Sequence, residues 1–135
     1  MTKVILNEEI EFDRLDLFAV KLRDLLFKNS TVFLKGEVGV GKTSLVVAFA
    51  KLFGIKTAQS PTYAIHQRYQ NLEVTIDHFD LYRLDTEEQI ESSGFSELVG
   101  QLSDYRFIEW GERLETTSFL QPLYHLEIIY KEERK

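Results

Sequence analysis

Hydrophobic and polar positions along the chain repeat with periods that predict alternating helices and strands. Between about residues 13 and 28, leucine and phenylalanine recur at helical spacing with charged residues between them, which predicts an amphipathic helix packed on a sheet. Thr31 to Leu34 is a short apolar run typical of a buried strand, and Leu45 to Phe53 is apolar enough for a helix buried on most sides. Val4 to Leu6 predicts an edge strand. This succession of helices and strands indicates an α/β fold.

The second half of the chain continues the pattern. Thr62 to Tyr69 and Leu72 to Phe79 predict two strands, joined as a hairpin at Gln70-Asn71. Alternate residues of the second strand are apolar at first and polar by Asp80, and ligands bind at the carboxyl ends of strands in open α/β sheets. Further elements are predicted as a helix over residues 86–92 capped by Asp85 or Thr86, a helical turn over 95–99, and strands over 105–110 and 123–130.

A glycine-rich stretch, GEVGVGKTS, joins the predicted strand at residues 31–34 to the predicted helix at residues 45–53. It fits the phosphate-binding pattern G-x-x-x-x-G-K-[ST], because three glycines lead into a lysine and a threonine. A phosphate chain needs several backbone N–H groups at close range, which larger side chains would obstruct. The alternative is a glycine-rich turn that precedes a lysine by accident. Strand, loop and helix in this order disfavour it, because they aim a helix N-terminus at the anion.

The residue types in this loop predict how it would hold a nucleotide. Lys42 places a positive charge against the β and γ phosphates, Thr43 offers a hydroxyl to Mg²⁺, and Ser44 lies on the first helical turn near the α-phosphate. The residues predicted to contact the nucleotide are Glu37, Val38, Gly39, Val40, Gly41, Lys42, Thr43 and Ser44.

Carboxylates that follow apolar strands are candidates for a magnesium site, because a nucleotide hydrolase holds this ion from a second strand. The run ending at Asp80 offers that residue or Asp77, and the run ending at Trp110 offers Glu109. Alternation puts Asp80 at the end of its strand and Asp77 on the opposite face, so we predict that Asp80 and Glu109 contact metal or water. His78 shares the face of Asp80, and both a core position and a direct role stay open for it.

Composition limits the classes of function that the chain can have. Its 135 residues predict one domain, spanning residues 1–135. Sixteen basic residues against twenty-two acidic ones give a net charge of −6, which argues against broad electrostatic attraction to nucleic acid. Cysteine is absent, which excludes disulfides and thiolate chemistry. Because no apolar run is long enough for a signal core or a bilayer span, we expect a soluble, cytoplasmic protein.

Several strings taken together resemble a known family. The phosphate-binding loop of this short chain is followed by Ser60-Pro61-Thr62, then by His78-Phe79-Asp80-Leu81-Tyr82-Arg83-Leu84, and then by Ile108-Glu109-Trp110. This combination resembles the TsaE (YjeE) family, the small bacterial ATPases required for threonylcarbamoyladenosine modification of tRNA. The resemblance runs from about residue 10 to residue 130, and the H-x-D-L-Y-R-L string is far more specific than the loop alone.

The resemblance implies a P-loop NTPase fold, with a mixed sheet whose parallel central strands are flanked by antiparallel strands and helices. It implies ATP and Mg²⁺ as cofactors, with Lys42 on the phosphates. Thr62 would belong to a switch-like segment near the γ-phosphate, and Trp110 to the wall of the nucleotide site. The metal ion would be surrounded by Thr43, Asp80 and Glu109. The catalytic residues would be Lys42, Thr62, Asp80 and Glu109.

The family also implies partners and a biological role. Its members use ATP to drive conformational cycling of a complex with TsaB and TsaD proteins, which modifies position 37 of ANN-decoding tRNAs. The chain would then reach tRNA through that complex, and no membrane would be involved.

Two other functions stay open, and one residue departs from the family. A small-molecule P-loop kinase shares the loop but needs an acceptor pocket and usually an arginine-bearing lid. Arg83, Arg106 and Arg113 are too scattered in sequence to form an obvious lid. A nucleotide-dependent interaction module would differ from an ATPase in rate more than in structure. Gly111 stands where the family commonly has proline, and we expect it to loosen the following loop.

Overall fold

The structure is a computed structural model that describes residues 3–10, 14–36, 42–56, 65–114, 120 and 122–130. For residues 3–10, 42, 129 and 130 it describes the backbone only. The predicted phosphate-binding residues from Glu37 to Gly41, and the predicted switch residue Thr62, lie outside the described residues.

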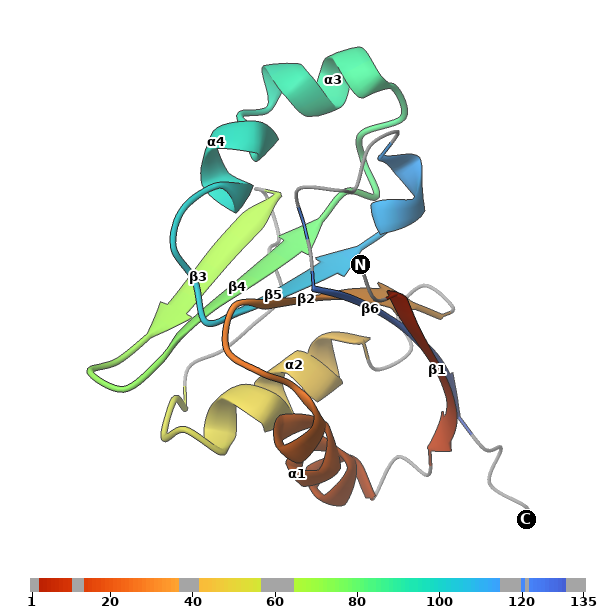
Figure 1. The fold of residues 1–135 in the computed structure, drawn as a ribbon. Helices are drawn as coiled ribbons and strands as arrows, with labels where there is room; N and C mark the ends of the chain where they lie inside the picture. Colours follow the sequence, from red (N-terminus) through yellow and green to blue (C-terminus); the bar gives the residue numbers. More distant parts are fainter. Residues whose placement is uncertain are drawn as a thin grey trace.

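The described strands form a six-stranded sheet in the order β1-β6-β2-β5-β4-β3 (Figure 1). The strands are β1 (Lys3–Ile10), β2 (Ser30–Lys35), β3 (His66–Gln70), β4 (Thr75–Asp80), β5 (Tyr105–Glu109) and β6 (Leu123–Tyr130). Neighbouring strands from β1 to β4 are parallel, whereas β3 pairs antiparallel with β4. The predicted α/β fold with a mixed sheet is confirmed.

The two edges of the described sheet differ. At one edge, the predicted hairpin of β3 and β4 supplies the antiparallel pair. At the other edge, the strand predicted at Val4 to Leu6 is present as β1, but it pairs parallel to β6. Strands from opposite ends of a chain can pair in either direction, because no tight turn between them requires antiparallel pairing.

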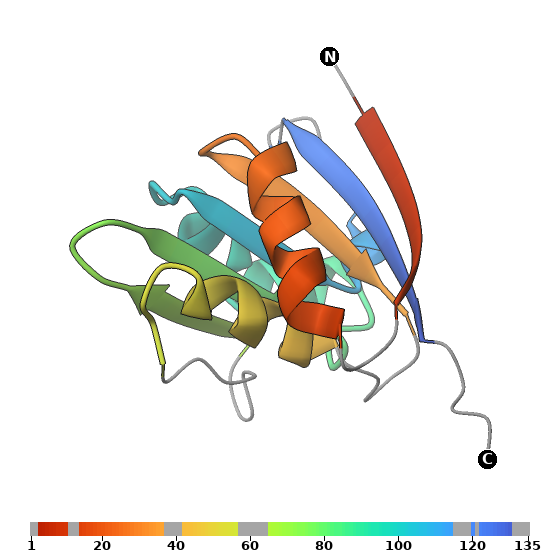
Figure 2. The same cartoon turned by 90° about the horizontal axis from the view of Figure 1, so that it is seen from below.

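Helices cover both faces of this sheet (Figures 1 and 2). On one face, α1 (Leu15–Leu25) packs against α2 (Lys42–Lys51). On the other face lie α3 (Glu87–Ser92) and α4 (Phe95–Val99). Thr86 provides the N-cap of α3 and forms a capping box with Gln89. Each face of the sheet therefore has its own apolar core.

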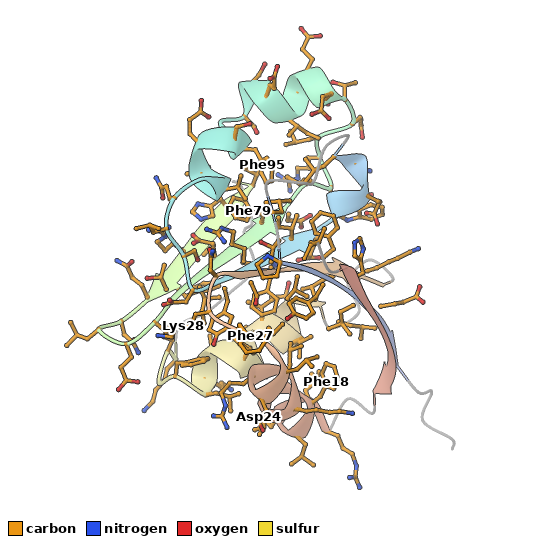
Figure 3. All side chains as sticks on the ribbon, in the orientation of Figure 1. Phe18, Asp24, Phe27, Lys28, Phe79 and Phe95 are labelled. Carbon is orange, nitrogen blue, oxygen red and sulfur yellow. The ribbon has the colours of Figure 1, made fainter. Side chains whose placement is uncertain are left out.

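Strand alternation decides which residues enter each core. Ile76 belongs to the core beneath α1 and α2, whereas Phe79 belongs to the core beneath α3 and α4. Figure 3 shows Phe79 beside Phe95 on the latter side, and their ring centroids are 5.2 Å apart. The four residues from Ile76 to Phe79 are all buried, as expected for a strand covered by helices on both faces.

The turn between β3 and β4 differs from the prediction. β4 begins at Thr75 rather than Leu72, and Leu72 is fully exposed. The Oδ1 atom of Asn71 accepts hydrogen bonds from the backbone N–H groups of Glu73 at 2.9 Å and Val74 at 3.0 Å. The N–H of Asn71 donates to the carbonyl of Val74 at 3.0 Å. An asparagine side chain that closes a turn in this way takes up residues that alternation alone assigns to a strand.

Asp77 lies in a buried cluster on the α3–α4 face of the sheet, opposite to the face of Asp80, as strand alternation predicts. Arg68 donates two hydrogen bonds to its carboxylate, at 3.0 and 3.1 Å, and Nε2 of His66 lies 2.5 Å from Oδ1. Burial by itself would raise the pKa of Asp77, but the hydrogen bonds from His66 and Arg68 hold this pKa below its ordinary value of 3.8. Asp77 thus stabilises the hairpin as a carboxylate.

We expect Asp77→Asn to lower the free energy of unfolding at pH 7 by roughly 1.5–3 kcal/mol, because Arg68 and His66 lose a charged acceptor. Since the pKa of Asp77 is depressed in the folded state, its contribution is fully present above the ordinary value of 3.8 and is lost as the pH falls through the lower folded-state pKa. Urea unfolding of both proteins should show the difference shrinking only in acid. A difference that is constant down to strong acid would contradict this account.

Candidate nucleotide site

Three neighbouring parallel strands bring the predicted site residues together at the carboxyl ends of the strands. Strand β2 leads directly into Gly36, the first residue of the glycine-rich stretch. Beside it, β5 ends at Glu109, and beside that strand β4 ends at Asp80. Asp80 and Glu109 are direct partners in the β4–β5 register, and Leu34 of β2 is the partner of Glu109 on the other side. The two carboxylates therefore end adjacent strands, next to the strand that opens the loop.

Helix α2 begins at Lys42, immediately after the undescribed part of the loop. Thr43 and Ser44 lie half-buried in its first turn. The backbone thus has the strand–loop–helix order that the sequence predicts for phosphate binding. The side chain of Lys42 lies outside the described part of the structure, so its contact with phosphate stays a prediction, as do the contacts of Glu37 to Gly41.

Glu109 is buried and paired with a histidine. It is 5% exposed and His78 is fully buried, and Nε2 of His78 lies 2.6 Å from Oε2 of Glu109. Buried carboxylates are stable only when they are hydrogen-bonded. His78 is thus a buried residue that contacts one of the two candidate carboxylates.

Asp80 is held by backbone contacts from both neighbouring segments. Its N–H donates to the carbonyl of Ile65 at 2.8 Å, and its Oδ1 accepts from the N–H of Tyr82 at 3.0 Å. The next residue, Leu81, donates its N–H to the carbonyl of Glu109 at 3.1 Å. Asp80 therefore links the start of β3 to the end of β5.

A cation–aromatic cluster beside the carboxylates was not predicted from the sequence. The guanidinium carbon of Arg113 lies 4.8 Å from the ring centroid of Trp110 and 5.8 Å from that of Tyr82. The same guanidinium donates to the carbonyls of Leu81 and Leu84, each at 3.0 Å, and to the carbonyl of Tyr82. Arg113 thus ties the loop that follows β4 to the turn that follows β5.

The sequence carried a weak signal for this cluster. It showed an aromatic–arginine pair in Tyr82-Arg83 and a tryptophan after β5, but the arginine that joins the two loops is Arg113 rather than Arg83. About thirty residues separate Arg113 from the carbonyls it binds, and only the sheet register makes them neighbours. The local periodicity of a sequence cannot predict such a contact.

Comparison with known proteins identifies the family. The family model described as threonylcarbamoyl adenosine biosynthesis protein TsaE matches residues 11–135. The chain belongs to the TsaE family. It is 34% identical over 134 residues to the tRNA threonylcarbamoyladenosine biosynthesis protein TsaE of Rickettsia felis, covering 98% of this chain and 75% of that protein. It is 28% identical over 138 residues to the same-named protein of Aquifex aeolicus, covering 100% of this chain and 93% of that protein.

A solved structure supports the fold. The crystal structure of YdiB from Bacillus subtilis superposes with a TM-score of 0.61 over 93% of this chain and 75% of that one, at 19% sequence identity. At this identity, the likeness shows a shared fold.

The donor atoms at the strand ends fit the magnesium ion that TsaE membership implies. Asp80 and Glu109 offer carboxylate oxygens, which this ion prefers. In the described residues, no group of three or more histidine, cysteine, aspartate or glutamate side chains is placed to hold a metal ion. Two protein carboxylates suit Mg²⁺ nevertheless, because it takes few protein ligands and completes its shell with water and phosphate oxygens.

Gly111, the residue at which this TsaE chain departs from its family, is tightly packed. It opens the short turn η2 (Gly111–Arg113) and is buried. A Cβ atom at this position would lie 2.7 Å from the ring of Phe33 on β2, which is closer than carbon atoms normally approach. The loop that we expected the glycine to loosen continues through residues 115–119, which lie outside the described residues. At position 111 itself, the absence of a side chain lets the turn lie directly against Phe33.

No helix in the described ranges of the chain is long and apolar enough to cross a bilayer.

We expect Arg113→Lys to loosen the Trp110 turn, because the compact ammonium of lysine lacks the planar guanidinium that lies against the rings of Trp110 and Tyr82. Trp110 is the only tryptophan, so acrylamide quenching of its fluorescence measures this change directly. Quenching should increase, and stability should fall by about 1–3 kcal/mol.

Arg106→Lys is the matched control. Arg106 also donates to two backbone carbonyls, those of Val99 and Gln101, but it lies near the start of β5, whereas Trp110 follows the end of that strand. Equal quenching increases in both variants would show that Arg113 has no specific role at Trp110.

Proposed function

We propose that this TsaE family member is a Mg²⁺-dependent ATPase that supports threonylcarbamoyladenosine modification of tRNA at position 37 of ANN-decoding tRNAs. The observation that carries the proposal is the register of the sheet. Asp80 and Glu109 are cross-strand partners, and Glu109 is also the partner of Leu34, two residues before the glycine-rich stretch. The start of the predicted phosphate-binding loop and the two carboxylates thereby lie at the carboxyl ends of neighbouring strands, which is the arrangement that nucleotide hydrolysis requires.

The roles of the site residues follow from their chemistry. Backbone N–H groups from Glu37 to Ser44 would cradle the phosphates at the N-terminus of α2, with the Lys42 ammonium adding positive charge. Trp110 would line the nucleotide site. The metal ion would be held by Thr43, Asp80 and Glu109. When bound, it would neutralise phosphate charge that develops during hydrolysis.

The segment that contains Thr62 is connected to Asp80 through Ile65. It leads directly into Ile65, whose carbonyl accepts the hydrogen bond from the N–H of Asp80. A change near Thr62 that shifts Ile65 would therefore shift the backbone of Asp80. The Thr62 segment and Asp80 would therefore respond together to the state of the nucleotide.

Two of the three arginines weighed for a lid, Arg106 and Arg113, are held by the fold and so disfavour the kinase alternative, whereas Arg83 is exposed. A phosphoryl-transfer lid needs a guanidinium that can move onto the substrate. Arg113 is bound to three carbonyls, Arg106 to the two carbonyls noted above and to Oδ1 of Asn29 at 3.0 Å, and Arg68 to Asp77. Each of these side chains is already committed to holding the fold.

The proposed ATPase would act through protein partners. The names of the curated relatives place them in tRNA threonylcarbamoyladenosine biosynthesis, and we propose that proteins of the TsaB and TsaD families bind this chain. With a net charge of −6, the chain itself is a poor ligand for tRNA, so tRNA would be bound by the complex. A cytoplasmic location accords with this role.

Lys42→Ala tests the nucleotide site. Loss of a charge-assisted phosphate contact is expected to cost roughly 1.5–3 kcal/mol, so the affinity for ATP should fall by about one to two orders of magnitude and hydrolysis should be lost. Calorimetric titration with ATP and a phosphate-release assay measure the two effects. Wild-type affinity in this variant would refute the proposed site.

Asp80→Ala and Asp77→Ala provide the contrast in the same assays. Asp80→Ala should retain most of the nucleotide affinity but lose Mg²⁺-dependent turnover, because the phosphate loop stays intact. Asp77→Ala should lose stability while its folded fraction hydrolyses ATP. Loss of turnover in Asp77→Ala but not in Asp80→Ala would place the metal site on the face of the sheet that carries Asp77.

We further expect slow ATP hydrolysis by the chain alone and a marked change in rate when the partners are added. A nucleotide can shift an association equilibrium only by binding one state more tightly than the other. Sedimentation of the chain with purified TsaB and TsaD should therefore give different affinities with an ATP analogue, with ADP and without nucleotide. Equal affinity in all three conditions would exclude nucleotide-driven cycling and favour the kinase alternative.

A further inference from the structure

Two histidine–carboxylate pairs lie on opposite faces of β4. On the α3–α4 face, Nε2 of His66 lies 2.5 Å from Asp77, whose carboxylate also binds Arg68. On the other face, Nε2 of His78 lies 2.6 Å from Glu109. The first pair includes a permanent cation and sits away from the strand ends. The second joins a histidine to a carboxylate of the proposed nucleotide site.

The surroundings of His78 determine where its proton resides. The imidazole is fully buried, and among the described residues its Nδ1 atom has no hydrogen-bond partner. A protonated Nδ1 would bury an unpaired N–H group, which native structures rarely contain, whereas an acceptor without a partner is more readily tolerated.

These constraints leave one arrangement. With no partner for a proton on Nδ1, the ring donates from Nε2, which lies 2.6 Å from Oε2 of Glu109. The acceptor is then a carboxylate oxygen, and such hydrogen bonds are short and strong. A buried ring cannot rotate without displacing its neighbours, so the direction of this donor is set by the packing of β4.

We propose that His78 is a positioning residue for Glu109. Through its Nε2–H group, it holds the carboxylate of Glu109 at the carboxyl end of β5, beside the strand that leads into the glycine-rich stretch. His78 itself is sealed in the protein interior, so it acts on the reaction only through Glu109. The catalytic consequence of this arrangement rests on the ATPase function proposed above.

The state of the ring can be measured without nucleotide or metal. Long-range proton–nitrogen NMR correlations distinguish the two neutral tautomers of histidine from the imidazolium. The chain has three histidines, so spectra of His66→Gln and His125→Gln assign the remaining signals to His78. We expect a proton on Nε2. A ring whose only proton is on Nδ1 would overturn the proposal.

Substitutions test the consequence for Glu109. His78→Gln keeps an N–H donor at a similar distance from the backbone, whereas His78→Leu removes it. In His78→Leu, kcat should fall by about one to two orders of magnitude, as for loss of a hydrogen bond to a charged group, with little change in KM for ATP. The affinity for Mn²⁺ in the presence of ADP, measured by electron paramagnetic resonance, should also fall. His78→Gln should recover most of both.

The His66–Asp77 pair on the opposite face of β4 supplies the control. His66→Leu removes a hydrogen bond to a buried carboxylate from the opposite face, so it should lower thermal stability to a similar extent and leave kcat and Mn²⁺ affinity unchanged. Equal losses of kcat in His66→Leu and His78→Leu, or equal losses in both His78 variants, would refute the positioning role.

The proposed function can fail separately. If the wild-type chain neither binds nor hydrolyses ATP, the ATPase assignment is wrong, and the tautomer of His78 still decides whether this residue holds Glu109.

Discussion

The parallel pairing of β4 with β5 is the constraint on which the candidate site depends. It aligns Asp80 with Glu109, and the pairing of β5 with β2 places Glu109 beside the start of the glycine-rich stretch, with Asp80 on the next strand. A shift of one residue between β4 and β5 would turn Asp77 or Phe79 toward the α1–α2 face and remove Asp80 from it. The apolar cores on the two faces prevent that shift, because each accepts only one set of alternate side chains.

Several contacts then reinforce the register at the end where chemistry is proposed. The hydrogen bonds of Asp80 to Ile65 and of Leu81 to Glu109 extend the ladder beyond the last strand residues. Arg113 fastens the loop after β4 to the turn after β5. The result is a rigid frame around two carboxylates, as preorganised electrostatic stabilisation requires.

Much of this arrangement could be predicted from the sequence, and the rest could not. Periodicity predicted both helices of the α1–α2 layer, the strands, and the opposite faces of Asp77 and Asp80, because these depend on local geometry. It missed the Asn71 turn, where side-chain hydrogen bonds override alternation. It also left His78 undecided and missed Arg113, whose partners are about thirty residues away in sequence and become neighbours only through strand pairing.

The close approach of Gly111 to Phe33 makes the side chains that are possible at one position depend on the side chain at the other. The aromatic ring occupies the volume in which any larger residue at position 111 would place its first side-chain carbon. A larger residue at position 111 would therefore require either a shift of the Phe33 ring or a smaller residue on β2. The space between the sheet and its turn is filled jointly by these two positions, so they should be exchanged as a pair when this turn is grafted onto another chain.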